Sequence, residues 1–271
     1  MISGRLAGST AISVRLGAGP PPPPLAPPAT RIIAALSAVG ADALLILRPV
    51  ADMVTLVSDN VSVLTNEGTL GSSFSAVQGN PTFQPPWNAT GINGRPCLDL
   101  SSGSTGLRVA TPSVDLSSYG FVALFAIFQD PSAIAAETPF GSGAGGVIAG
   151  SMAIFTGWTA LGSIGTRGGN QWVYSAATYP MTTPAVVTAT LDGSTNKRRI
   201  RHASTDVTAS FSEAGSSYTF GNLVFTAGNG GSSGVNFTGL LGPMVLAASS
   251  TAIDGSVLTE VETIMAEDWG L

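Results

Sequence analysis

Side chains that commonly do chemistry are few and scattered in this chain. His202 is the only histidine and Cys97 the only cysteine, so neither a histidine-based metal site nor an intrachain disulfide can form. The 16 acidic residues are spread along the sequence, whereas glycoside hydrolysis needs two carboxylates roughly 5–10 Å apart. We therefore expect no enzyme, no metal and no cofactor, although folding could still bring distant carboxylates together.

Three aromatic residues could serve as a platform for sugar rings, which stack on flat aromatic faces. They are Trp158, Trp172 and Tyr179, and both tryptophans lie near glycine-rich segments typical of accessible turns. The alternative is that they belong to the core or its rim, because large aromatics bury much apolar area.

A basic run follows the Asp-Gly turn signal at residues 192–193. Its members are Lys197, Arg198, Arg199 and Arg201, and His202 comes directly after them. The turn places the run on the flank of a hairpin, with His202 on the hairpin surface. Either the run is a solvated edge that prevents strand pairing between molecules, or it contacts an acidic neighbouring subunit or an anionic glycan.

The chain carries little charge and no basic excess. Charged residues make up 10% of the sequence and the formal net charge is −5, so the electrostatic footprint of nucleic-acid binding is missing. The most apolar stretch, residues 32–47, is interrupted by Gly40 and Asp42 and is shorter than the roughly 20 residues of a membrane span. We expect no membrane insertion, and residues 1–5 do not resemble a secretory signal.

The first 29 residues differ from the rest. Ile12, Val14 and Leu16 alternate with polar residues, which is the period of a half-buried strand. Prolines crowd residues 20–28 and favour a stiff extended spacer of roughly 25–30 Å. We predict a docking arm over residues 1–19, a spacer over 20–29 and one folded domain over 30–271. The apolar residues of this arm are Ile2, Leu6, Ile12, Val14 and Leu16. The alternative is a disordered tail with accidental alternation.

From residue 30 onward, short apolar runs are separated by Gly, Ser, Asn and Pro, as in an all-β sandwich. Residues 121–128 (FVALFAIF) are apolar on both faces and predict a central strand. One helix is expected at the C-terminal end, capped by Asp254 or Ser256. Its apolar stripe at helical spacing consists of Val257, Leu258, Val261, Ile264 and Met265.

Several motifs, in order, resemble the concanavalin A-like, laminin-G-like domains. They are residues 92–100 (INGRPCLDL), 121–128 (FVALFAIF), 186–194 (VVTATLDGS), 237–246 (FTGLLGPMVL) and 268–271 (DWGL). The resemblance covers about residues 43–271 and implies an antiparallel two-sheet jelly roll with a C-terminal helix. Many such domains bind calcium, but Asp99, Asp115 and Asp130, which follow predicted strands, form no Asp-x-Asp run. Cys97 replaces a small apolar residue, so we expect a buried, inert thiol.

Similar domains occur in tail, fibre and head-decoration proteins of tailed bacteriophages and in secreted bacterial proteins. Together with the low charge and the arm, this favours a non-enzymatic structural protein on a virion surface. Its arm would dock on other virion proteins of capsid or tail, and the chain would form a homo-oligomer, with host-surface polysaccharide as a further ligand. The alternative is a carbohydrate-binding module of an extracellular or cell-surface protein.

Overall fold

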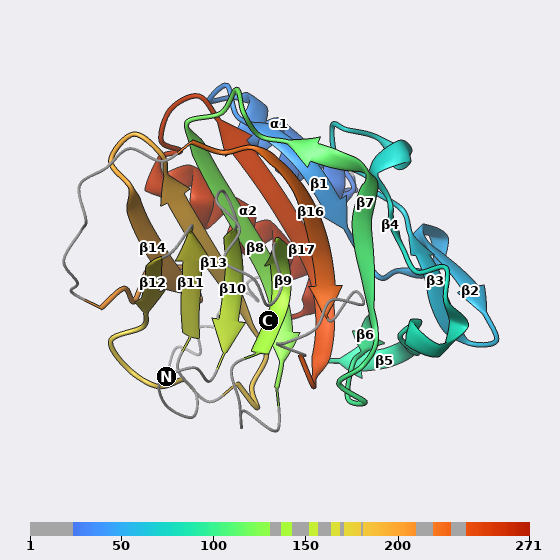
Figure 1. Cartoon of the computed structure of the whole chain (residues 1–271). Coiled ribbons are helices and arrows are strands. Elements are labelled where there is room, and N and C mark those ends of the chain that lie inside the picture. Colours follow the sequence, from blue (N-terminus) through green and yellow to red (C-terminus); the bar gives the residue numbers. More distant parts are fainter. Residues whose placement is uncertain are drawn as a thin grey trace, which may run out of the picture.

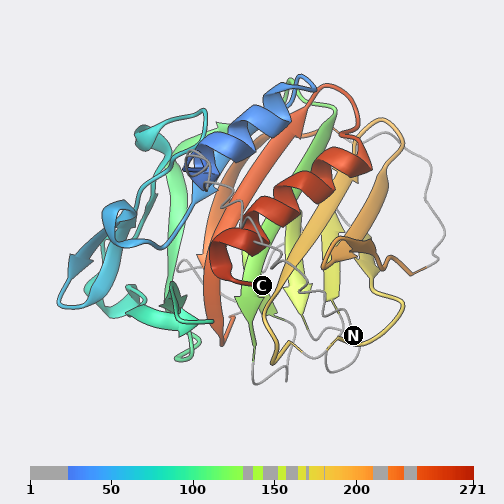
Figure 2. The same ribbon diagram turned by 180° about the vertical axis from the view of Figure 1, so that it is seen from behind.

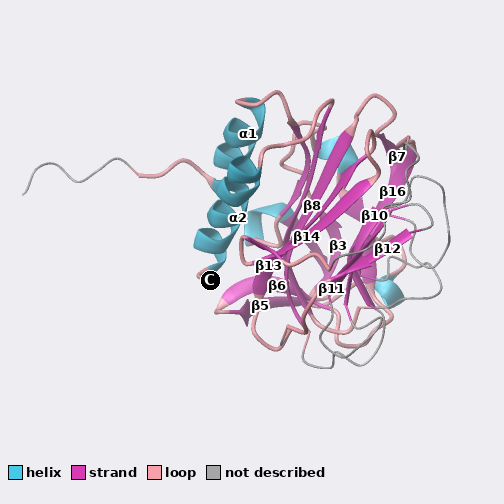
Figure 3. Cartoon of the chain, turned by 90° about the vertical axis from the view of Figure 1, so that its left-hand side faces the viewer, coloured by secondary structure: helices cyan, strands magenta, loops and turns pink. Residues whose placement is uncertain are grey.

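A computed structural model describes residues 24–130, 137–142, 152–156, 164–168, 171–179, 181–209, 219–228 and 237–271. Two helices cover one face of a sandwich of two antiparallel sheets (Figures 1 and 3). The predicted all-β sandwich is confirmed. The arm, residues 1–19, lies outside the described residues.

Sheet A has the strand order β15-β14-β13-β8-β17-β6-β5, and β1 also pairs with β17. Its strands are β1 (Asp42–Leu47), β5 (Trp87–Ile92), β6 (Arg95–Asp99), β8 (Phe121–Gln129), β13 (Ala185–Asp192), β14 (Lys197–His202), β15 (Thr205–Asp206) and β17 (Leu240–Ser249).

Sheet B has the strand order β12-β11-β10-β9-β16-β7-β4-β3-β2. Its strands are β2 (Val54–Val57), β3 (Asn60–Leu64), β4 (Ala76–Val77), β7 (Gly106–Asp115), β9 (Glu137–Ser142), β10 (Met152–Thr156), β11 (Ile164–Gly168), β12 (Gln171–Tyr174) and β16 (Asn222–Gly228). Three short 3₁₀ helices span Ala51–Met53, Ser72–Phe74 and Pro81–Phe83.

Strand β8 shows why the sequence folds into three layers. Successive side chains of a strand point to opposite faces, and both faces of β8 are apolar. Val122, Leu124, Ala126 and Phe128 pack between the two sheets, whereas Phe121, Ala123, Phe125 and Ile127 pack under the helices. The predicted central strand is confirmed, since β8 lies between β13 and β17.

Both helices cover the outer face of sheet A (Figure 2). Helix α2 (Gly255–Trp269) begins as expected, with the Asp254 carboxylate accepting a hydrogen bond from the Ser256 N–H at 2.7 Å. It ends at Gly270, whose φ of 67° suits a glycine. Its apolar stripe and Trp269 pack on the sheet.

Helix α1 (Pro28–Ser37) was not expected from the sequence, which predicted one helix only. It begins inside the predicted proline spacer, because a proline is tolerated in the first helical turn, where its missing N–H costs no hydrogen bond. Ala29, Ile32, Ala35 and Leu36 follow at helical spacing and are buried against sheet A and α2. Among the described residues, no helix is long and apolar enough to cross a lipid bilayer.

Candidate functional site

The predicted aromatic platform is only partly described. Trp158 lies outside the described residues, and of Trp172 only the backbone is described, in the edge strand β12 opposite Arg167. Tyr179 is half-buried against the core between the sheets, and its ring centroid lies 4.4 Å from that of His202. One face of the Tyr179 ring is therefore occupied by a protein side chain. Burial lowers the pKa of His202, so the neutral imidazole is favoured in this contact.

The basic run is divided between buried and accessible positions. Arg198 is 1% exposed and donates hydrogen bonds to the Asn196 backbone carbonyl at 3.0 Å and to its side-chain oxygen at 2.8 Å. Lys197 is exposed, and the Arg199 side chain is 43% exposed with its Nε 3.9 Å from Asp206. Contact with an anionic partner stays a prediction. Of the four basic residues in the run, Lys197 and Arg199 are the ones accessible enough to make such a contact.

Arg201, the last member of the run, joins β14 to α2. Its guanidinium donates two hydrogen bonds to the Glu262 carboxylate, at 2.9 and 3.1 Å. Further bonds reach the Thr259 hydroxyl at 2.6 Å and the Ser204 carbonyl at 2.9 Å. Because the Glu262 side chain is 1% exposed, this pair is an internal contact between the sheet and the helix.

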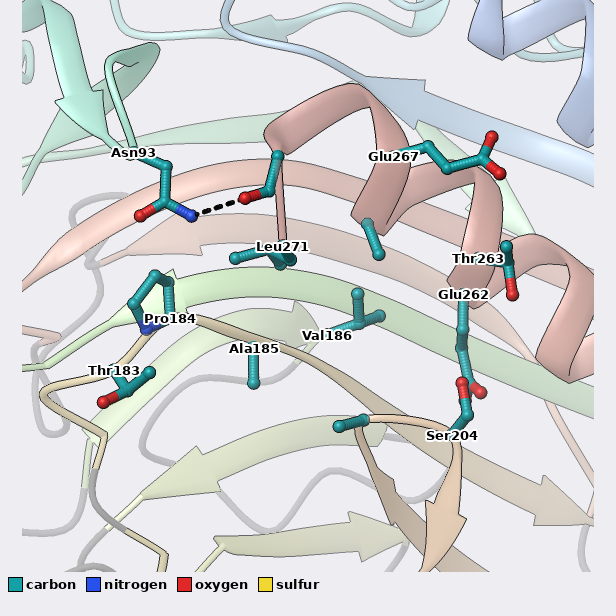
Figure 4. A pocket seen from close by; sticks show the side chains of 13 residues that line it. Asn93, Thr183, Pro184, Ala185, Val186, Ser204, Glu262, Thr263, Glu267 and Leu271 are labelled. Atoms are coloured by element: carbon teal, nitrogen blue, oxygen red, sulfur yellow. Dashed lines mark hydrogen bonds between the residues drawn. The ribbon is translucent and has the colours of Figure 1, made fainter.

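Beside this pair lies a groove of about 620 Å³, which we call the α2 groove (Figure 4). Three connections of sheet A converge there on the C-terminal half of α2: the β5–β6 turn, the segment entering β13 and the β14–β15 turn. The groove is lined by Asn93, Thr183, Pro184, Ala185, Val186, Ala203, Ser204, Glu262, Thr263, Ala266, Glu267, Gly270 and Leu271.

The β5–β6 turn fixes one end of the α2 groove. Asn93 and Gly94 have φ values of 50° and 74°, as a tight hairpin turn requires. The Asn93 side-chain amide donates a hydrogen bond to the Gly270 carbonyl at 3.1 Å (Figure 4). The turn is thereby tied to the end of α2. The sequence singled out this Asn-Gly pair as part of the family resemblance and not as part of a site.

Both glutamates of the α2 groove are held by arginines. Glu262 is bound to Arg201 as described above, and Glu267 lies 2.7 Å from Arg31 on α1. A glycosidase needs one carboxyl group to donate a proton and a second to attack or to activate water. Two carboxylates already engaged in ion pairs are poorly suited to either role.

The other polar groups of the α2 groove are neutral. Thr183, Ser204 and Thr263 bring hydroxyl groups and Asn93 brings an amide. Pro184, Ala185, Val186 and Leu271 provide a floor of small apolar side chains, which gather in the middle of Figure 4. Such a lining suits a neutral ligand with both hydroxyl groups and apolar C–H faces.

A second polar cluster, Asp130 and Glu137, is closed to solvent. Asp130 is 0% and Glu137 4% exposed. The Glu137 carboxylate accepts hydrogen bonds from the Thr238 N–H at 3.0 Å and from its hydroxyl at 2.5 Å. Burial, and to a smaller extent the neighbouring Asp130, raise the pKa of Glu137. Within the described residues, no group of three or more His, Cys, Asp or Glu side chains could hold a metal ion.

No protein family and no curated protein matches the sequence. Solved structures do match the fold, among them domain 4 of AbnA, a GH43 extracellular arabinanase from Geobacillus stearothermophilus, in complex with arabinotriose. It has 13% identity and a TM-score of 0.55, over 82% of this chain and 99% of that chain.

An arabinofuranosidase complexed with arabinofuranosyl-alpha-1,2-xylobiose matches at 13% identity and a TM-score of 0.54, over 87% of this chain and 65% of that one. A Trypanosoma rangeli sialidase has 13% identity and a TM-score of 0.50, over 84% of this chain and 33% of its own. The chain thus spans nearly all of the arabinanase domain but less than two thirds of the two larger proteins. At these identities the likeness shows a shared β-sandwich fold, while the bacteriophage setting of the resemblance stays a prediction.

Proposed function

We propose that this chain is a carbohydrate-binding β-sandwich without catalytic activity, which binds neutral oligosaccharide in the α2 groove. The observation that carries the proposal is the lining of that groove, where hydroxyl and amide groups surround small apolar side chains and both carboxylates are paired. The volume of about 620 Å³ lies within the range of roughly 300–1,000 Å³ of small-molecule sites.

The chemistry of a sugar fits this lining. A neutral oligosaccharide offers many hydroxyl groups, which need hydrogen-bond partners when they leave water. Its ring faces carry C–H groups, which can pack on Ala185, Val186 and Leu271. The fold match to a domain solved with arabinotriose supports the same ligand class. A positively charged ligand would find both carboxylates of the groove already paired with arginines, so the groove offers it no free opposite charge.

The test is binding of the full-length chain to a panel of neutral oligosaccharides that includes arabinotriose, measured by titration calorimetry. Ala185→Trp places a large side chain in the groove, and Asn93→Gly removes the amide while keeping a residue that accepts the turn. Ala38→Trp, at an exposed position after α1, is the matched control. We expect Ala185→Trp to abolish binding, Asn93→Gly to weaken it and Ala38→Trp to leave it unchanged. If a folded Ala185→Trp variant bound oligosaccharide as tightly as the unaltered chain, the binding site would lie outside the α2 groove.

A second candidate is a structural protein of a phage-like particle, with the sandwich displayed on the virion surface. Residues 1–29 favour it, because an alternating apolar segment on a proline spacer is suited to docking on another protein of capsid or tail. The charged fraction of 10% also suits a chain packed among neighbours. Particles purified on a density gradient should contain the chain at a fixed ratio to the major capsid protein. Its recovery only from the soluble or cell-surface fraction would contradict this role.

A further inference from the structure

Strand β2 is an open sheet edge with apolar side chains. It is the last strand of sheet B and lies at the margin of the molecule (Figure 1). Leu56 is 38% and Val57 46% exposed. Exposed edge strands offer unpaired backbone groups to other chains, and proteins that stay monomeric usually protect them with charges, prolines or bulges on the edge. The register of β2 against β3 shifts between Thr55 and Leu56, and the edge beyond this shift carries the exposed apolar residues Leu56 and Val57.

The apolar surface continues from this edge across the neighbouring strands. Thr55 pairs with Val63, and Val63 pairs with Val77 on β4. Leu64 and Ala76, the residues next to Val63 and Val77 in the sequence, face the core, so Val63 and Val77 lie on the outer face of sheet B. Val77 is 44% exposed. A strand added beside β2 would therefore extend an existing apolar strip.

The distribution of charge along the chain indicates which segment could pair with this edge. The exposed residues Asp52 and Asp59 flank β2 at its two ends. Residues 1–23 contain two arginines, Arg5 and Arg15, and no acidic residue. The rest of the chain holds the other nine basic and all 16 acidic residues, so a segment of charge +2 faces a domain of formal charge −7. Opposite charges of this kind favour encounter and docking.

We propose that residues 10–17 of one copy add as a strand to β2 of a second copy. Ile12, Val14 and Leu16 would extend the apolar strip of the outer face, and the backbone of the segment would pair with the open edge. This is strand addition, in which main-chain hydrogen bonds give affinity and alternate side chains give specificity.

The proline spacer favours pairing of residues 10–17 with β2 of a second copy over pairing with β2 of the same chain. Helix α1 begins at Pro28, and the eight residues 20–27, of which six are proline, would span about 25 Å at ~3.1 Å per residue as an extended spacer. A proline-rich spacer of this composition is semi-rigid, which disfavours a fold-back of residues 10–17 onto the edge of their own domain. Association through it would build an assembly from copies of this chain alone.

Light scattering coupled to size-exclusion chromatography, over a range of concentrations, tests the proposal with the full-length chain. Val57→Lys charges the receiving edge, Val14→Lys charges the arm, and Val39→Lys alters an equally exposed valine after α1, in a segment that is not part of sheet B. We expect the unaltered chain and Val39→Lys to associate alike. Val57→Lys and Val14→Lys should each weaken association about tenfold or more, because a lysine on an edge opposes pairing.

A peptide of residues 8–19 should dissociate the assembly by competing for the edge. A chain that is monomeric at every concentration would overturn the proposal. So would association that is sensitive to Val14→Lys but not to Val57→Lys, since the arm would then dock on another surface. Circular dichroism checks that each variant is folded. Oligosaccharide binding should be the same in all three variants, so failure here is distinguishable from failure of the proposed function.

Discussion

The Arg201–Glu262 pair allows a sharp test of how α2 is fixed to the sandwich. The side chains are 13% and 1% exposed, so removal of Glu262 leaves the largely buried Arg201 guanidinium without an opposite charge. Breaking such a pair costs about 3–5 kcal/mol. We expect Glu262→Ala to lower the free energy of unfolding by about 3 kcal/mol, which for a domain of this size lowers Tm by roughly 6–12 °C.

The same helix supplies the matched control. Glu267 pairs with Arg31 at 2.7 Å, but the side chains are 52% and 26% exposed. Exposed ion pairs contribute about 0–1 kcal/mol, so Glu267→Ala should lower stability by less than about 1 kcal/mol. Urea unfolding followed by circular dichroism measures both variants. If the two variants lost equal free energy of unfolding, burial of the ion pair would not determine the cost of breaking it.

Three further outcomes follow from single positions. Burial raises the pKa of Glu137, so folding favours its protonated form. The contribution of this group to stability is therefore present at low pH and is lost as the pH rises through its folded pKa. Glu137→Gln should flatten this dependence of Tm on pH. Gly141→Ala should lower the urea midpoint markedly, because its Cβ would lie 2.3 Å from the Cβ of Ala153, whereas Gly79→Ala meets no atom within 4 Å and should change little. Burial raises the pKa of the Cys97 thiol to about 12, so a disulfide reagent at pH 8 should react with it only after denaturation.

The layers of the fold could be predicted from local pattern. The apolar stretch that became β8 requires cover on both faces, and the structure provides sheet B on one side and the helices on the other. The burial expected for Cys97 is confirmed, whereas the inertness of its thiol stays a prediction. Helix α1 was missed because the prolines that begin it are also typical of an extended spacer.

The α2 groove could not be predicted, because no local pattern contains it. Asn93, Thr183, Ser204 and Thr263 are distant in sequence, and only the convergence of three connections on α2 brings them together. Which residues of the basic run are buried and which are exposed could not be predicted from the sequence either. Arg198 is buried with its guanidinium hydrogen-bonded to the carbonyl and side-chain oxygens of Asn196, whereas Lys197 between them is exposed.

Calorimetric titration of the full-length chain with neutral oligosaccharides, followed by chromatography of the recovered ligand, tests directly whether this chain binds carbohydrate without cleaving it. We expect saturable binding at one site per chain, with every oligosaccharide recovered intact. Absence of saturable binding across the panel, or recovery of shortened oligosaccharides, would contradict a non-catalytic carbohydrate-binding sandwich.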